Sequence, residues 1–484
     1  MEFLGFTGPA YEARSRYQDA QLSVNWYPEP SPEAGAKTPM TLYPTPGLSL
    51  FWNVPSSASI TASPVRFAYS PPSRRELCVL AVGNKLVTVV PNGASYTFAT
   101  SDLQSNVGPM SAADNGTTIL IVDGSDAGYT VDIATGTVGS ISGGDGFYGG
   151  DRVVCLDSVF VLNKPDTNQF YWSDLVSTTF DPLNFASKEA SPDLLMVAWA
   201  EHRELWLLGQ YTTEVWYNSG NGGAETFARN DGVFLQHGCA AVHSVSRLGE
   251  TFAFLSTDER GSYQVKMAQG YGLQTISTPA LDYEFAQYET VDDAIAFTYR
   301  ASGHEFYQLT FPNANKTWVY DVNTQMWHQR GYLNAQGDID RHRANCFVNY
   351  RGSVLVGDQQ NGLVYEYAED VYTDNGSAIA RIRRCPHIIN DRKEVRYNWL
   401  EVEFQPGVGL TTGQGSDPQA MLRWSDDGGS TWSNEHWTSI GASGNYRARA
   451  YWMRLGSARD RVFEVRVTDP VNAVVIGSTL DVSG

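Results

Sequence analysis

Short apolar runs separated by tight turns dominate the chain from about residue 60 to residue 395. ELCVLAVGNKLVTVVPNGASYTFAT and TTILIVDGSDAGYTVDIATGTVGSI are examples of this rhythm. Asn-Gly or Asp-Gly pairs, the strongest short-range signal for a β-hairpin, begin at residues 92, 115, 123, 145, 231, 361 and 375. The pattern therefore predicts antiparallel strands joined by tight turns.

The hairpins recur as larger units. Arg203–Asn221 has two β runs about one turn, and His304–Gly331 and Ser353–Asp370 repeat this form. A recurrence of ~40–50 residues is typical of the four-stranded blades of a β-propeller. The sequence thus predicts an all-β protein in which residues 61–395 form a propeller of about six or seven blades.

Two stretches depart from this rhythm. Tyr283–Phe297 has apolar residues at helical spacing, which predicts a helix there. Residues 28–47, PEPSPEAGAKTPMTLYPTPG, are rich in Pro and Gly, so we expect no regular element in them. We interpret residues 1–60 as an extended N-terminal arm that is ordered by packing on the propeller or on a neighbouring chain.

Strict alternation of polar and apolar residues marks the end of the chain, as in WLEVEF and FEVRVTD. This pattern is typical of antiparallel strands with one face in water. Residues 396–484 are therefore predicted to form a C-terminal β-sandwich. A rare basic cluster precedes them, and it is expected to be either a solvated face or a contact with an acidic protein neighbour: Arg381, Arg383, Arg384, Arg392, Lys393 and Arg396.

The chain is acidic, with 34 Lys and Arg residues against 53 Asp and Glu residues and a formal net charge of −19. Such a surface repels nucleic acid and anionic membranes at long range. The 5 cysteines are scattered without a C-x-x-C pair, so we expect free, buried thiols made in a reducing compartment, and neither a disulfide framework nor a zinc site. The N-terminus lacks the features of a secretory signal, and no apolar run is long enough to span a bilayer.

One stretch contains a motif that is known from enzymes: LRWSDDGGSTWS. Within it, five residues fit S-x-D-x-G-x-T-W, the Asp-box found in sialidases and other propeller glycosidases: Ser425, Asp427, Gly429, Thr431 and Trp432. Physically the motif is a hairpin turn, in which the aspartate accepts backbone N–H bonds and the tryptophan is buried beneath the turn. It occurs once and outside the propeller, so we predict a structural role and no catalytic one.

Other catalytic and cofactor motifs are missing. The sequence contains no P-loop, Rossmann fingerprint, H-E-x-x-H, EF-hand loop or G-x-S-x-G elbow. The arginine entry motif of sialidases is absent, and its nearest counterpart is RIRR at Arg381–Arg384. We therefore expect no enzyme activity, no cofactor and no metal.

Several passages, in order along the chain, resemble one family, the tail-hub or nozzle proteins of short-tailed bacteriophages, which are also called packaged-DNA stabilisation proteins. The passages that carry the resemblance are Val24–Glu29, Leu42–Leu48, Glu204–Gly220, Thr290–Arg300 and Leu309–Gly331. Each is weak alone, and the ordered set is specific.

The resemblance implies a structural virion protein. It would form a ring, usually a homohexamer, that extends the DNA channel below the portal and its head-to-tail adaptor protein. The ring would retain packaged DNA until a tail needle or plug leaves, and it would help to seat tail spikes or fibres. DNA would pass without specific binding, and the chain would be assembled in the host cytoplasm into the virion tail without entering a membrane.

Two alternatives remain open at this point. The Asp-box favours a tail-associated propeller glycosidase or depolymerase, and exposed aromatic residues would suit a carbohydrate-binding propeller. Assembly state discriminates between the classes, because a ring favours the hub whereas a monomer or trimer with glycan turnover favours the others.

Overall fold

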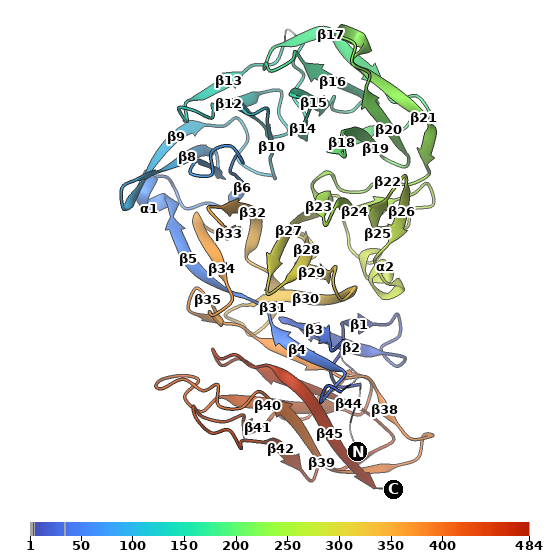
Figure 1. Cartoon of the computed structure of the whole chain (residues 1–484). Coiled ribbons are helices and arrows are strands. Elements are labelled where there is room, and N and C mark those ends of the chain that lie inside the picture. The colour runs from blue at the N-terminus through green and yellow to red at the C-terminus, as the bar shows by residue number, and fades with distance from the viewer. Residues whose placement is uncertain (1–2, 4, 33–34, 145, 484) are drawn as a thin grey trace.

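The structure is a computed structural model that describes residues 3, 5–32, 35–144 and 146–483. Figure 1 shows a ring of small sheets joined to a second domain, in which both ends of the chain lie. Almost all regular structure is β, and the two α-helices in the described residues are short: α1 (Val54–Ala58) and α2 (Pro279–Phe285).

Seven sheets of the described residues form the ring, and the first four each contain four consecutive strands. The first is β6 (Val65–Tyr69), β7 (Cys78–Val82), β8 (Lys85–Asn92) and β9 (Ser95–Asp102). The second is β10 (Ser111–Asp114), β11 (Thr118–Val122), β12 (Gly128–Asp132) and β13 (Val138–Ile141). The third is β14 (Val153–Leu156), β15 (Val159–Asn163), β16 (Gln169–Ser173) and β17 (Phe180–Ser187). The fourth is β18 (Leu195–Glu201), β19 (Glu204–Gly209), β20 (Thr213–Asn218) and β21 (Phe227–Leu235).

The last three sheets complete the propeller. In the fifth, β22 (Gly238–Cys239) and β23 (Ser246–Leu248) both pair with β24 (Thr251–Thr257), followed by β25 (Tyr263–Gln269) and β26 (Gly272–Thr275). The sixth is β27 (Ile295–Ala301), β28 (His304–Phe311), β29 (Lys316–Asp321) and β30 (Met326–Leu333). The seventh is β32 (Ala344–Tyr350), β33 (Ser353–Asp358), β34 (Leu363–Ala368) and β5 (Gly47–Asn53).

The blades pack face to face, which explains their continuous apolar runs. In β7, every residue from Cys78 to Val82 is buried. Val79 and Ala81 pack in a cluster with residues of the second blade, whereas Cys78, Leu80 and Val82 pack in a cluster with residues of the seventh. A strand covered on both faces needs no polar side. Successive side chains of β7 therefore point alternately to the two neighbouring blades, and neither face lies in water.

The ring is closed by the start of the chain. Strand β5 pairs with β34 antiparallel, from Leu363 opposite Asn53 to Ala368 opposite Gly47. The seventh blade therefore contains strands from both ends of the propeller sequence (Figure 1). This strand pair holds the first and the last parts of the propeller sequence together.

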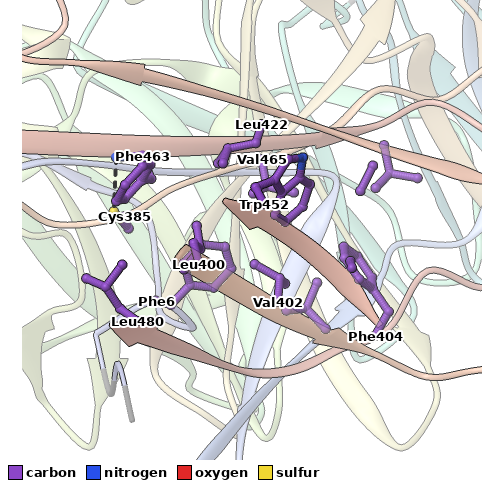
Figure 2. Packing of buried hydrophobic residues seen from close by; sticks show 14 of the residues in the cluster. Phe6, Cys385, Leu400, Val402, Phe404, Leu422, Trp452, Phe463, Val465 and Leu480 are labelled. Carbon is purple, nitrogen blue, oxygen red and sulfur yellow. Dashed lines mark hydrogen bonds between the residues drawn. The ribbon is translucent and has the colours of Figure 1, made fainter. Parts of the chain in front are cut away.

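The second domain is a β-sandwich. One sheet contains β37 (Arg381–Arg384), β44 (Asp460–Val467), β40 (Gln419–Ser425) and β41 (His436–Ser439). The other contains β45 (Val475–Ser483), β39 (Val395–Phe404) and β42 (Ala450–Met453). Figure 2 shows the apolar side chains that fill the space between them, including Leu400, Leu422 and Trp452. The sandwich thus begins at β37, before the predicted limit at residue 396.

The N-terminal segment is built into both domains, so the prediction of no regular element in residues 28–47 was wrong. Strand β2 (Ala20–Val24) pairs with β37 and meets β30, which joins the sixth blade to one sandwich sheet. Strands β3 (Trp26–Pro30) and β4 (Met40–Pro44) form a hairpin, and β4 pairs with β45 of the other sheet. Residues 33–34 lie outside the described residues.

Short strands complete the edges of these sheets. They are β1 (Tyr11–Glu12), β31 (Ile339–Arg341), β35 (Thr373–Asp374), β36 (Ser377–Ala378), β38 (Ile388–Ile389) and β43 (Ser457–Ala458). Strands β35 and β36 are joined by Asn375 and Gly376, with φ angles of 50° and 85°. Both residues of a type I′ turn need positive φ, so this Asn-Gly pair forms the hairpin that its sequence predicts.

Two local predictions fail. The helix predicted over Tyr283–Phe297 ends at Phe285 in α2, and β27 begins at Ile295. The Asp-Gly pair at 231 lies inside β21 and does not form a turn. The pair at 145 cannot be compared, because Asp145 lies outside the described residues.

Candidate functional sites at the Asp-box turn and the domain junction

The Asp-box forms a turn that satisfies its own polar groups. Asp427 accepts hydrogen bonds from the backbone N of Thr431 at 2.8 Å and from its hydroxyl at 2.7 Å. The Ser425 hydroxyl donates to Asp427 and accepts from the backbone N of Gly429, both at 2.7 Å. Gly429 has a φ of 94°, a conformation that glycine adopts without strain.

These donors also fix the charge of Asp427. The backbone and side-chain hydrogen bonds from Thr431, followed by the one from Ser425, lower the pKa of the carboxyl to about 2. A carboxylate stabilised in this way is a poor proton donor near neutral pH. The geometry therefore suits a structural turn and does not suit a general acid.

Trp432 does not lie buried beneath the turn, as the sequence predicted, but is half-buried. The guanidinium carbons of Arg384 and Arg423 lie 5.0 and 4.6 Å from the centre of its ring. Both arginines also donate through Nε to the buried carboxylate of Glu464, at 2.9 and 2.7 Å. The structure thus brings the Asp-box into contact with one member of the predicted basic cluster.

We predict that Asp427→Ala lowers the thermal unfolding midpoint modestly, because the turn loses both bonds to Thr431. The folded-state pKa is depressed from the ordinary 3.8 to about 2. The stabilisation by Asp427 is therefore present above pH ~4 and is lost as the pH falls towards ~2. Unfolding midpoints of both proteins across this pH range measure the effect. The difference between them should shrink at low pH.

Ser430→Ala is the matched control, because Ser430 is exposed in the same turn. It should leave the midpoint unchanged. A difference between Asp427→Ala and the unmodified chain that grows towards pH 2 would contradict the assignment.

Arg383 lies inside the protein, which corrects its prediction as a surface residue. Its side chain is fully buried and faces the N-terminal segment. The guanidinium donates to the carbonyl oxygens of Phe6 at 2.5 Å and Pro9 at 2.9 Å, and to the side-chain oxygen of Gln21 at 2.7 Å. A Cβ at Gly8 would lie 2.9 Å from the guanidinium, so glycine permits this close approach. Burial lowers the pKa of Arg383 to about 10.

Arg381 is also buried, at the junction of the two domains. It donates to the carbonyl oxygen of Asp469 at 3.3 Å and interacts electrostatically with Asp374 in β35. Burial raises the pKa of Asp374 to about 6, although Arg330, Arg343 and Arg381 all act in the opposite direction. These buried charges therefore contribute to the contact between the two domains, and an external partner cannot reach them.

The buried position of both arginines follows from strand geometry. Residues two apart on a strand point to the same side, so Arg381 and Arg383 of β37 share one side and Arg384 lies on the other. A count of charges in the sequence cannot show which side is covered.

Three members of the predicted cluster remain on the surface, whereas Arg384 is half-buried. Arg392, Lys393 and Arg396 are exposed, and the acidic residues Asp391 and Glu394 lie beside them. The surface around Arg392 and Lys393 is therefore of mixed charge, and its contact with an acidic neighbour stays a prediction.

Asn25 is a junction residue that the sequence did not reveal. It is buried with a φ of 55°, a conformation that asparagine tolerates better than most residues. Its side-chain amide donates to the carbonyl oxygens of Gly331 at 2.9 Å and Ala380 at 2.8 Å, and its oxygen accepts from the backbone N of Gly331 at 3.0 Å. One side chain thus links the sixth blade to the start of the sandwich.

Candidate metal and membrane features are few. In the parts of the chain that the structure describes, no group of three His, Cys, Asp or Glu residues lies close enough to hold a metal ion. The cysteines are free, as the sequence predicted, but Cys155 and Cys346 are only half-buried, so the prediction of buried thiols was wrong for these two. Among the described helices, none is long and apolar enough to cross a membrane.

The fold defines a propeller protein with a C-terminal β-sandwich, held together by its N-terminal strands. Two family models match the chain: "Bacteriophage P22 Gp10, beta-propeller" over residues 6–372 and "Bacteriophage P22 Gp10, beta-sandwich" over residues 380–483. The chain therefore belongs to the Gp10 family of structural phage tail proteins, which confirms the predicted resemblance and the predicted fold class. A search among curated proteins gave no match.

Proposed function

We propose that the chain is the subunit of a nozzle ring in the virion tail. The ring would continue the DNA channel below the portal and the head-to-tail adaptor protein, retain packaged DNA, and release it when a tail needle or plug leaves. The observation that carries this proposal is the family match over both domains. Tail spikes or fibres would dock on the outside of the ring.

The way in which the domains are joined supports this role. Strand β2 pairs with β30 of the sixth blade and β37 of the sandwich, β4 pairs with β45 of the sandwich and carries β3 at its edge, and β5 closes the seventh blade. A subunit whose domains share strands resists bending at the junction. Such a rigid subunit suits a ring that surrounds DNA under pressure.

The ring is tested by its assembly state. Mass measurement and electron microscopy of the purified chain, alone and mixed with its adaptor, should give a closed ring of about six copies, since head-to-tail interfaces close into rings. A monomer or trimer that stays so with the adaptor present, together with glycan turnover, would contradict the proposal and favour a glycosidase.

We predict that the protein does not bind duplex DNA at physiological salt. Six copies would carry six times the formal charge of −19, which is −114. Tight DNA binding requires Lys or Arg to displace counterions from the phosphates, and two of the predicted basic residues, Arg381 and Arg383, are buried. Retention would therefore be mechanical, by closure of the ring below the DNA. Fluorescence anisotropy of a labelled duplex across a salt series measures this.

The exposed residues Arg392, Lys393 and Arg396 give the decisive variant. A salt-dependent dissociation constant in the range of about 1 μM or tighter, abolished when these three are changed to glutamine, would make the protein a DNA clamp and overturn the prediction.

A further inference from the structure

A cavity of about 390 Å³ lies at the centre of the propeller. It is lined by residues of several blades, among them Arg66 of β6, Ile295 of β27 and Asn345 of β32. A hollow of about 190 Å³ shares these three residues and extends to β10. Figure 1 shows the first strands of the blades around the axis of the ring, so this cavity is axial.

Arg341 supplies free donors to the cavity. Its guanidinium has no hydrogen bond or ion pair with any described residue, although burial lowers its pKa. Arg66 differs, because it donates to the carbonyl oxygens of Gly83 at 2.9 Å and Gly108 at 3.0 Å. Arginine stays protonated at neutral pH, so Arg341 presents a charged, planar set of donors, and the carboxyls of Asp293 and Asp358 act on its charge only electrostatically, without a hydrogen bond.

Acceptors lie in the same cavity. Asp293 accepts from the backbone N of Asn313 through Oδ2 at 2.7 Å, whereas its buried Oδ1 has no partner among the described residues. Burial is the main cause of a raised pKa for Asp293. His243 is neutral, because burial and then Arg152 lower its pKa to about 3. The cavity thus offers the free guanidinium donors of Arg341, the unpartnered carboxyl oxygen of Asp293 and the neutral imidazole of His243.

Apolar groups complete the lining. Val107, Pro109, Ile295 and Pro312 stand beside these polar groups. A pocket with apolar walls and a few convergent polar groups is typical of a small-ligand site. The two neighbouring carboxyls, Asp292 and Asp293, oppose a doubly charged phosphate but can accept hydrogen bonds from hydroxyl groups.

We propose that this axial cavity binds a carboxylate-bearing saccharide, such as a hexuronic acid at the end of an anionic glycan. The guanidinium of Arg341 pairs with the carboxylate in two parallel hydrogen bonds. Asp293 and His243 accept from the sugar hydroxyls, and the apolar walls contact the C–H face of the ring. The site lies within a single chain, on the axis of its propeller, so the inference does not rest on the proposed nozzle.

The test uses the full chain with glucuronate, glucose and acetate, observed by saturation-transfer NMR and titration. Glucuronate should bind with a dissociation constant of about 1 mM, and glucose and acetate should bind at least about tenfold more weakly. Arg341→Gln should weaken glucuronate binding about ten- to a hundredfold. The control Arg75→Gln changes an exposed arginine of the same domain and should have no effect.

Asp293→Asn keeps the inference testable if Arg341→Gln does not fold. It should weaken glucuronate binding several-fold with an unchanged unfolding midpoint. Absence of glucuronate binding at about 10 mM would overturn the proposal. Equal binding of glucose would show that the carboxylate, and hence its pairing with Arg341, does not contribute to affinity. Equal binding of acetate would show that the site is only a pocket for small anions. Either result contradicts a site for a carboxylate-bearing saccharide.

Discussion

Replacing Arg383 with methionine is expected to lower the free energy of unfolding by about 3–5 kcal/mol. The guanidinium donates to carbonyl oxygens of Phe6 and Pro9 and to Gln21. Each buried acceptor that loses its donor costs about 1–3 kcal/mol. Methionine fills a similar volume, so the loss reports on the hydrogen bonds and not on a cavity.

The measurement is chemical denaturation combined with limited proteolysis of the N-terminal segment. Arg383→Met should expose residues 5–22 to protease before the rest of the chain unfolds, because these residues hold their place through this side chain. Arg392→Met is the control, since Arg392 is exposed. An equal loss of stability in both variants, or a protected N-terminus in Arg383→Met, would show that Arg383 is not the clamp.

The overall architecture is predictable from the sequence because it depends on local pattern. Hairpin pairs such as Asn92-Gly93 and Asn375-Gly376 fix where strands reverse, and repeated strand–turn units indicate blades. The closing strand β5 could not be assigned in the same way. Its partner β34 lies about three hundred residues further along the chain, and such non-local pairing leaves no local signal.

The N-terminal hairpin shows how composition misled the prediction. Pro28 and Pro30 lie in β3, which is at the edge of its sheet. Proline lacks a backbone donor, and an edge strand has one side on which no donor is needed. A Pro-rich segment can therefore still be a strand, and here it pairs from Trp26 opposite Pro44 to Pro30 opposite Met40.

The failed helix has a different cause. Phe285 and Val291 are buried in one cluster, and Tyr288 packs against it. Their spacing therefore indicates correctly that these residues face the core. A compact turn after α2 places them there, so a helix is not needed. Hydrophobic periodicity over so short a stretch identifies the buried face better than it identifies the element.

The candidate sites were harder to predict than the fold. The Asp-box has a local signature, and its residues lie together. The junction residues Asn25, Asp374 and Arg381 come from distant segments, and so do Arg341 and His243 of the axial cavity. Only the closed ring and the shared strands bring these side chains together, so no motif in the sequence marks them.

Replacing Trp26 with alanine is expected to cost about 3–5 kcal/mol, the range for removing a large buried aromatic side chain. Trp26 is fully buried in the core of the sandwich, although it precedes the propeller in sequence. Its indole N donates to the carbonyl oxygen of Ala473 at 2.8 Å. The adjacent Asn25 bonds to Gly331 and Ala380, so this dipeptide fixes both domains at once.

Loss of Trp26 should therefore also separate the unfolding of the two domains. Calorimetry of the unmodified chain should show one transition, and Trp26→Ala should show an earlier transition for the sandwich followed by one for the propeller. Trp437→Ala is the matched control, because Trp437 lies in the sandwich strand β41 and is 60% exposed. Surface substitutions of this kind usually change stability by less than about 0.5 kcal/mol. A single transition in Trp26→Ala, lowered no more than in Trp437→Ala, would mean that the N-terminal strands do not join the domains.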